Sequence, residues 1–221
     1  LDMGIYLNPE NYKFQETINS EIYVDKTEMI TYTNKKLHTE QKYVCVSRPR
    51  RFGKSVAAKM LEAYYSRGCD SKDLFRNYKI VKCDSFGKHL NKYDVITLNM
   101  QEFLSESSSM EEMLSLLKKS VLWDLLEEYP DYRYFDTNNL VRTMKDIYVK
   151  TKRPFIIIID EWDCVIRNSE DKEVVHKYLQ FLHSIFKSEE SKSFLALAYI
   201  TGILPIKKIK EENCGLWLKI Y

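Results

Sequence analysis

The sequence predicts an α/β fold built around a mainly parallel sheet. Apolar, strand-like segments alternate along the chain with helical patterns, and this order is typical of parallel sheets. The segment 155–159 (FIIII) is continuously apolar, as expected for a strand that is buried on both faces. A second segment, 42–61, has the pattern of strand, loop and helix, with Gly-Lys-Ser where the loop meets the helix. The 221 residues, 44% apolar and 30% charged, are enough for one sizeable core.

The individual elements follow from hydrophobic periodicity and from helix-capping signals. Short apolar or alternating runs predict four strands, at 43–46, 94–100, 155–159 and 194–199. Apolar residues three and four apart predict helices at 27–36, 139–150 and 171–187. The same spacing, at 56, 57, 60, 61 and 64, predicts a helix directly after the Gly-Lys-Ser loop. A further helix is expected from the capping box at 109–112 to Pro130. Residues 8–23 are polar with scattered aromatic residues, and residues 66–90 are polar and favour loops, apart from a capped helical turn at 70–75.

The Gly-Lys-Ser junction predicts a phosphate-binding loop, or Walker A motif. A helix that starts directly after such a loop presents backbone N–H groups to an anion, and Gly53 allows a close approach because it has no Cβ. Lys54 would reach the β- and γ-phosphates, and Ser55 would offer its hydroxyl to Mg²⁺. The full pattern has glycine where this chain has Arg48. A helix start with a solvated lysine therefore stays open as the alternative. The expected nucleotide-binding residues are Arg50, Arg51, Phe52, Gly53, Lys54, Ser55 and Val56.

Acidic residues follow the buried strand in the manner of a Walker B motif. The carboxyl end of a central parallel strand lies at the edge where ligands bind. Asp160 would hold Mg²⁺ through water, together with Ser55, and Glu161 would polarise the attacking water as a general base. Thr201 ends the next strand and would touch the γ-phosphate or that water. Lys54, Glu161 and Thr201 are thus the expected catalytic residues. A solvated acidic turn and a simple strand cap are the alternatives.

Composition limits the class of protein. Thirty-four basic and 32 acidic residues leave a net charge of +2, which argues against a dedicated nucleic-acid coat. The five cysteines are widely spaced without a C-x-x-C pair, and Cys45 and Cys164 are expected to be buried thiols in a reducing cytoplasm. The sequence has no signal-like stretch and no apolar run of membrane-spanning length.

Four segments together resemble the bacterial AAA-ATPase-like family: YVDKT at 23–27, RPRRFGKS at 48–55, IDEWD at 159–163 and ITGILPIKK at 200–208. The resemblance implies a P-loop NTPase (AAA-like) three-layer sandwich at 1–208. It also implies Lys54 and Ser55 on phosphates and metal, Asp160 and Glu161 as Walker B, and Thr201 near sensor 1. In that family Arg-Pro-Arg-Arg-Phe replaces the glycine-led loop. Its members are predicted ATPases, frequently fused to a C-terminal nuclease domain of the restriction-endonuclease type.

The last residues depart from the family pattern. Residues 209–221 are expected to form a divergent tail, so that the chain is a C-terminally truncated member with an incomplete sheet. The exposed strand edge would then favour self-association. The expected function is Mg²⁺-dependent ATP hydrolysis with slow turnover, with ATP and Mg²⁺ as cofactors. Two alternatives stay open: a nucleotide-binding switch or scaffold with little turnover, and a DNA-binding accessory of a nuclease system that uses Arg48, Arg50 and Arg51.

Overall fold

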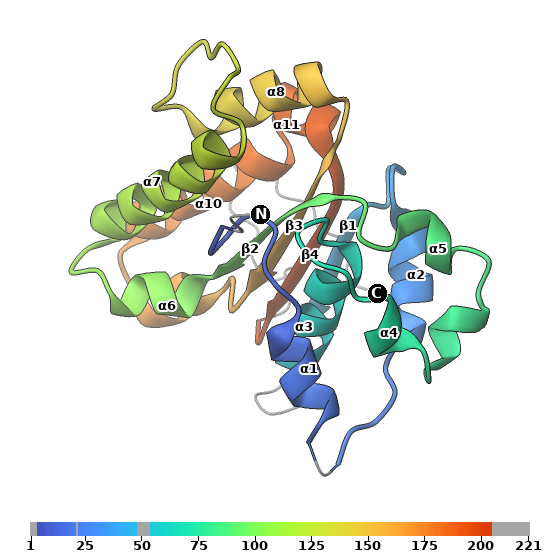
Figure 1. Cartoon of the computed structure of the whole chain (residues 1–221). Coiled ribbons are helices and arrows are strands. Elements are labelled where there is room, and N and C mark those ends of the chain that lie inside the picture. Colours follow the sequence, from blue (N-terminus) through green and yellow to red (C-terminus); the bar gives the residue numbers. More distant parts are fainter. Residues whose placement is uncertain (1–3, 21, 48–53, 205–221) are drawn as a thin grey trace.

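The computed structural model describes residues 4–20, 22–47 and 54–204, with the backbone alone at 54 and 55. Within this part of the chain, four strands form one sheet in the order β1-β4-β3-β2, and every neighbouring pair is parallel (Figure 1). The strands are β1 (Tyr43–Ser47), β2 (Asp94–Asn99), β3 (Phe155–Asp160) and β4 (Leu195–Gly202). The prediction of a parallel α/β sheet is confirmed. β4 continues three residues past its predicted end.

Helices cover both faces of this sheet and give three layers (Figure 1). One layer holds α1 (Tyr12–Ile18), α2 (Glu28–Lys36), α3 (Lys54–Tyr65), α4 (Lys72–Phe75), the 3-10 helix η1 (Lys79–Lys82) and α5 (Phe86–His89). The other layer holds α6 (Met100–Ser105), α7 (Met110–Glu128), α8 (Leu140–Thr151), α9 (Cys164–Asn168), α10 (Lys172–Phe186) and α11 (Glu189–Phe194).

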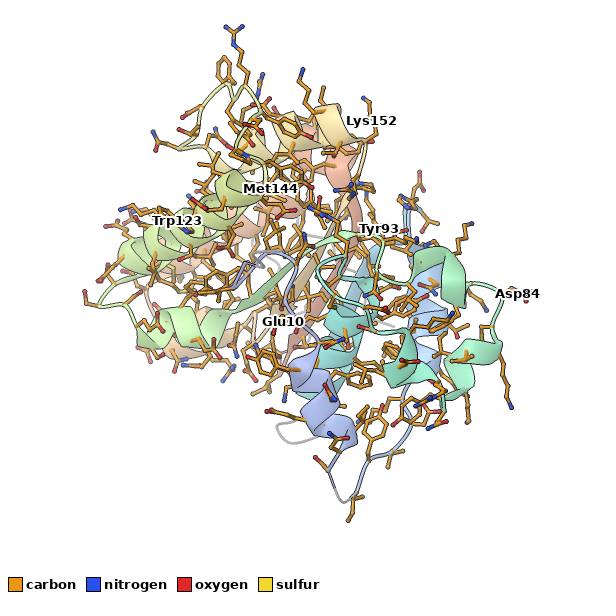
Figure 2. The ribbon with its side chains drawn as sticks, in the orientation of Figure 1. Glu10, Asp84, Tyr93, Trp123, Met144 and Lys152 are labelled. Atoms are coloured by element: carbon orange, nitrogen blue, oxygen red, sulfur yellow. The ribbon has the colours of Figure 1, made fainter. Side chains whose placement is uncertain are left out.

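The two hydrophobic cores lie on opposite faces of the sheet. On β3, Ile156 and Ile158 pack in the core that contains Leu61 of α3, whereas Ile157 and Ile159 pack in the core of the other layer. Successive side chains of a strand point to opposite faces. Both faces are covered, so the strand is continuously apolar rather than alternating. In the second layer, Met144 of α8 is buried and Trp123 of α7 is exposed (Figure 2).

Helix α3 runs in the opposite direction to the strands. Its last residue, Tyr65, accepts a backbone hydrogen bond of 3.0 Å from the N–H of Tyr93, which directly precedes β2. Arg67 returns a backbone bond of 3.0 Å to the Tyr93 carbonyl. The end of α3 therefore lies at the amino edge of the sheet, and its beginning at Lys54 lies toward the carboxyl edge. The sequence places only residues 48–53 between the end of β1 and the start of this helix.

The long predicted helices are present, and the additional helices are short. The predicted helices at 27–36, 109–130, 139–150 and 171–187 correspond to α2, α7, α8 and α10. In the region 66–90, α4 corresponds to the helical turn that was predicted at 70–75, whereas η1 and α5 lie where a loop was predicted; each of the three has four residues. In α1 only Phe14 is buried, so its sequence has no apolar stripe. Among the described residues, every helix is too short or too polar to span a bilayer.

Candidate functional site

Polar residues from neighbouring strands meet at the carboxyl edge of the sheet. The hydroxyl of Thr201, near the end of β4, donates a hydrogen bond to Oδ1 of Asp160, the last residue of β3. The same oxygen accepts the backbone N–H of Glu161 at 3.0 Å. In the sheet register Asp160 lies beside Asn99, and Thr201 lies beside Val46 of β1. The predicted site residues Asp160 and Thr201 are thus in direct contact.

Asp160 and Thr201 face the layer that contains α3. Ile158, two residues before Asp160, packs in the core on the α3 side, and so does Tyr199, two residues before Thr201. Because side chains two residues apart share a face of a strand, the carboxylate and the hydroxyl point to that side too. The beginning of α3 lies toward the same edge of the sheet. The described start of α3 and the pair of Asp160 and Thr201 therefore lie toward the same edge and the same face of the sheet.

The glycine-lysine-serine junction is described only in part. Lys54 is the first residue of α3 and Ser55 the second, but their side chains lie outside the described atoms. Arg50, Arg51, Phe52 and Gly53 lie outside the described residues, so their predicted contacts stay predictions. Val56 is partly buried in the first turn of the helix.

Glu161 begins a tight turn that is fastened to β4. Its φ is 55°, in the left-handed region that residues other than glycine seldom adopt. The N–H of Trp162 donates to the carbonyl of Thr201 at 3.1 Å, and the N–H of Cys164 donates to the carbonyl of Glu161 at 3.1 Å. Tyr178 of α10 donates its hydroxyl to the carbonyl of Trp162, whose indole is buried. The turn is therefore held by both β4 and α10.

Arg167 of α9 connects two acidic side chains of this turn. Its Nη2 lies 2.7 Å from Oε2 of Glu161, and its Nε lies 3.2 Å from Oδ2 of Asp163. The fully buried Asp163 also accepts the backbone N–H groups of Ile203 at 2.9 Å and Leu204 at 2.7 Å. Sequence analysis missed Arg167. The available signal was its position four residues after Asp163, since such pairs share a helix face.

Gly202 is required by the packing of the same turn. A Cβ at this position would lie 2.5 Å from Nε1 of Trp162 and 2.8 Å from Oδ1 of Asp163. A Cβ atom does not come this close to a heavy atom to which it is not bonded, and neither group has room to move because both side chains are buried. Glycine therefore lets the turn after β3 lie directly against the end of β4.

A further acid lies behind the site, on α3. Glu62 is buried, and one of its carboxylate oxygens accepts the hydroxyl of Thr97 on β2. Burial raises the pKa of Glu62, and the negative charge of Asp160 raises that pKa further, while the Thr97 hydrogen bond opposes the rise. The sequence signal was an acid inside the apolar segment Met60 to Tyr64 of a predicted helix. The negative charge of Asp160 at the carboxyl edge thus affects the pKa of a carboxyl group inside the α3 layer.

The family comparison agrees with this arrangement. A family model described as "Predicted AAA-ATPase" matches residues 12–210 and so includes both predicted motifs and the whole described sheet. No curated protein sequence gives a significant match. The match, the parallel sheet between two helical layers and the contact of Asp160 with Thr201 lead to one conclusion: this chain belongs to the predicted AAA-ATPase family.

Proposed function

We propose that this chain binds ATP with Mg²⁺ and hydrolyses it, as a cytoplasmic AAA-like ATPase whose working unit is residues 1–208. The observation that carries the proposal is the contact of Thr201 with Asp160 at the carboxyl edge, on the face toward the start of α3. The first turn of a helix offers unpaired N–H groups and a positive dipole end to phosphates. A carboxylate beside it can bind a metal that bridges those phosphates.

The binding part of the proposal uses the loop and the first turn of α3. Lys54 supplies the positive charge for the β- and γ-phosphates, and charge-assisted hydrogen bonds of this kind are the strong ones. Gly53 allows the backbone to approach the ligand closely. The residues that we assign to the nucleotide are Arg50, Arg51, Phe52, Gly53, Lys54, Ser55 and Val56.

The oxygen ligands at this edge suit Mg²⁺. Asp160 contributes a carboxylate, and Ser55 would contribute a hydroxyl. Among the described residues no group of three His, Cys, Asp or Glu side chains could hold a metal ion. Mg²⁺ does not need such a cage, because it usually takes one or two protein ligands and completes its shell with phosphate oxygens and water. When bound, the ion would neutralise charge on the transferred phosphoryl group.

The hydrolytic part of the proposal uses the residues after β3 and β4. Asp160 would hold Mg²⁺, and the Thr201 hydroxyl donates to its carboxylate and so fixes its position. Glu161 accepts a proton from the attacking water as a general base. In the structure its carboxylate is paired with Arg167 of α9, so this role requires the Glu161 side chain to leave that pair. Lys54 stabilises the charge that develops on the phosphates.

The first test removes the charge of Lys54. Lys54→Ala is expected to weaken ATP binding on the order of a hundredfold, because a charged hydrogen-bond donor to phosphate contributes up to about 3 kcal/mol. Isothermal titration with ATP measures the change. Lys59→Ala, on the same helix, is the matched control and should keep the wild-type affinity. Unchanged affinity in Lys54→Ala would contradict the assignment of the phosphate-binding loop.

The second test separates the two acids after β3. Glu161→Gln should keep ATP bound and stop turnover, because it retains the shape of the side chain but not its basicity. Asp160→Asn should instead weaken the Mg²⁺-dependent part of binding. Titrations with and without Mg²⁺, together with steady-state phosphate release, measure both effects. Wild-type rates in Glu161→Gln would rule out the general-base role.

A second candidate function is a nucleotide-binding switch with little turnover. One contact favours it: the carboxylate of Glu161 is engaged by Arg167 at 2.7 Å. We therefore expect turnover well below about one per second, the lower end of typical enzyme rates. Steady-state phosphate release at saturating ATP distinguishes the two functions.

A further inference from the structure

A pocket at the amino edge of the sheet gathers three lysine side chains, and we call it the lysine pocket. Lys42 comes directly before β1, Lys187 directly follows α10, and Lys192 lies on α11. Leu195, the first residue of β4, forms part of the wall. The pocket has a volume of about 570 Å³, which is in the range of sites that hold a small molecule.

The lysine pocket is separate from the proposed nucleotide site. Leu195 in its wall and Thr201 at that site lie six residues apart on β4. Because a strand rises about 3.3 Å per residue, these two residues are about 20 Å apart, at opposite edges of the sheet. A molecule in the lysine pocket would therefore be a second ligand, and the inference does not rest on the proposed function.

The positive charge of the lysine pocket is not balanced by the protein. Three lysines and one acid, Glu40, line it, which gives three positive charges against one negative and a net charge of +2. Among the described residues, neither Lys42 nor Lys187 forms an ion pair. Lys192 pairs at 3.3 Å with Glu189, whose side chain is 93% exposed, and such solvent-exposed pairs contribute little. The pocket thus offers a surplus of positive charge to an anion.

The ammonium groups in the lysine pocket repel one another. Burial lowers the pKa of Lys42, and the charge of Lys192 lowers it further. Burial likewise lowers the pKa of Lys187, and so do the charges of Lys192 and Lys42. A bound anion would offset this repulsion and add an attraction to each lysine.

Helix ends account for part of this charge, but not for Lys187. Nζ of Lys42 donates to the carbonyls of Lys192 and Leu195, both at 2.9 Å, at the end of α11. Nζ of Lys187 instead lies 3.4 Å from the centroid of the Tyr43 ring. The hydroxyl of Tyr43 donates to a backbone carbonyl of α10 at 2.8 Å and so fixes this ring. Within the described part of the chain, the ammonium group of Lys187 has no oxygen acceptor, so its N–H donors remain for a ligand.

We propose that the lysine pocket binds a small molecule through a phosphate monoester group, with Lys187 and Lys192 as its charged contacts. Such a group carries a charge of about −1.5 to −2 near neutral pH, which matches the +2 of the pocket. Lysine binds phosphate as a point charge and needs no fixed geometry. Tyr43 and Leu195 line the same pocket, so an organic group attached to the phosphate would meet an apolar wall.

The probe for this site is phenyl phosphate, titrated into the full chain by isothermal calorimetry. We expect saturable binding with a dissociation constant on the order of 1 mM, as for other ligands of this size. Lys187→Met keeps the side-chain length and the contact with Tyr43 but removes the charge, and it should weaken binding about tenfold. Lys192→Met should have a similar effect. Lys119→Met, at an exposed position on α7, is the matched control and should leave the affinity unchanged.

Acetylation of lysines followed by mass spectrometry of peptides locates the ligand. Phenyl phosphate should slow the modification of Lys187 and Lys192 severalfold and leave Lys119 unaffected. Sodium chloride at the same ionic strength is the comparison, because salt alone screens exposed charges. Equal protection by sodium chloride would overturn the inference.

Two further probes test the kind of ligand. Inorganic phosphate should bind severalfold more weakly than phenyl phosphate, because it lacks the apolar group, and equal affinity would contradict the organic ester. A single-stranded oligonucleotide without a terminal phosphate should not bind here. Tighter binding of the oligonucleotide than of phenyl phosphate, lost in Lys187→Met, would replace the small molecule by a nucleic acid.

The variants separate this inference from the proposed function. Unchanged affinity for phenyl phosphate in both Lys187→Met and Lys192→Met, with a cooperative thermal transition, would overturn the inference. The proposed phosphate-binding loop could also take the probe, and binding that is lost in Lys54→Ala but kept in Lys187→Met would overturn the inference as well. If Lys187→Met does not fold, Lys192→Met decides by the same criteria. Failure of the proposed function would appear elsewhere, as unchanged ATP affinity in Lys54→Ala.

Discussion

At the scale of single residues, Glu62 combines burial with the charge of the site. Its carboxylate is enclosed between α3 and β2, and its pKa is raised by burial and by Asp160. A carboxyl group whose pKa is higher in the folded than in the unfolded state binds its proton more tightly when folded. Its favourable contribution is therefore present below the ordinary glutamate pKa and is lost as the pH rises through the raised pKa.

Glu62→Gln is accordingly expected to stabilise the protein at neutral pH. Glutamine cannot ionise, yet its carbonyl oxygen can still accept the hydroxyl of Thr97. The melting temperature of the variant should exceed that of the wild type at pH 7, and the difference should vanish at or below the ordinary glutamate pKa. Thermal unfolding across a pH series measures this, with Glu127→Gln on the exposed side of α7 as the control. A difference that does not depend on pH would contradict the ionisation argument.

The positions of two predicted site residues, Asp160 and Thr201, could be derived from the sequence, whereas their roles in metal binding and catalysis stay predictions. Asp160 and Thr201 were predicted because they follow or end buried strands, and the ends of neighbouring parallel strands must meet at one edge. Arg167 and Glu62 were missed because they lie on helices. Tertiary packing determines which turn of a helix faces the site, and no local sequence pattern reveals that packing.

At the scale of elements, a segment near the amino end closes one edge of the sheet. Residues 6–8 run antiparallel along the outer side of β2: Asn8 donates its N–H to Val95 at 2.7 Å, and Thr97 donates to Tyr6 at 2.9 Å. The backbone N–H groups of Tyr6 and Leu7 donate to Oδ2 of Asp124 on α7, at 2.7 and 3.1 Å. The segment is thus fastened to a strand on one side and to a helix on the other.

Removal of the Asp124 carboxylate should loosen this segment. Asp124→Ala leaves two backbone donors without their acceptor, and we expect a loss of about 2 kcal/mol in the free energy of unfolding. Urea denaturation measures the loss, and hydrogen exchange at residues 6 and 7 should accelerate. Asp131→Ala, at an exposed position after the same helix, is the control. Full protection of both amides in Asp124→Ala would show that the β2 contacts alone hold the segment.

Element prediction depended on length. The strands and the helices α2, α7, α8 and α10 show several repeats of their hydrophobic period, so their existence could be predicted. A helix of four to seven residues has only one or two turns, which is too few for a period to appear. The segment at 6–8 pairs with β2 through a single bridge at Leu7, and three residues are too few to show an alternating pattern.

At the scale of the whole molecule, a buried ion cluster joins the layers at the amino edge of the sheet. Asp94, the first residue of β2, pairs with Arg67 after α3 and accepts the hydroxyl of Tyr129, at the end of α7, at 2.6 Å. Asn8 donates to the same carboxylate at 2.9 Å, and Arg153 donates to the Tyr129 hydroxyl at 2.8 Å. Both helical layers, β2 and the segment at 6–8 thus meet at one buried carboxylate.

Asp94→Ala is expected to destabilise the fold by about 3 kcal/mol, the lower end for breaking a buried ion pair, because Arg67 keeps Glu128 as a partner. Urea denaturation measures the change. Asp84→Ala is the control, since Asp84 points outward on the rim of the α3 layer (Figure 2). An effect of Asp94→Ala no larger than that of the control would show that the cluster adds nothing to stability.

The predicted self-association concerns the opposite edge of the sheet. Among the described residues, β1 has β4 as its one strand neighbour. The prediction that an open edge favours association stays a prediction. Light scattering of the purified chain across a concentration series tests it.

The architecture itself was predictable because alternating strands and helices allow few arrangements. The ion cluster was not predictable, because it joins residues far apart in the sequence and leaves no local pattern.

Under the proposed function, the order of the strands also sets a length requirement on the ligand. β4 lies between β1 and β3, so the ends of β1 and β3 are two strand spacings, about 10 Å, apart. The loop before α3 follows β1, and Asp160 ends β3. A lone phosphate at one end cannot reach the other, whereas a chain of linked phosphates can. Under the proposed function, the order of the strands therefore favours nucleotides whose phosphate chain is long enough to span this distance.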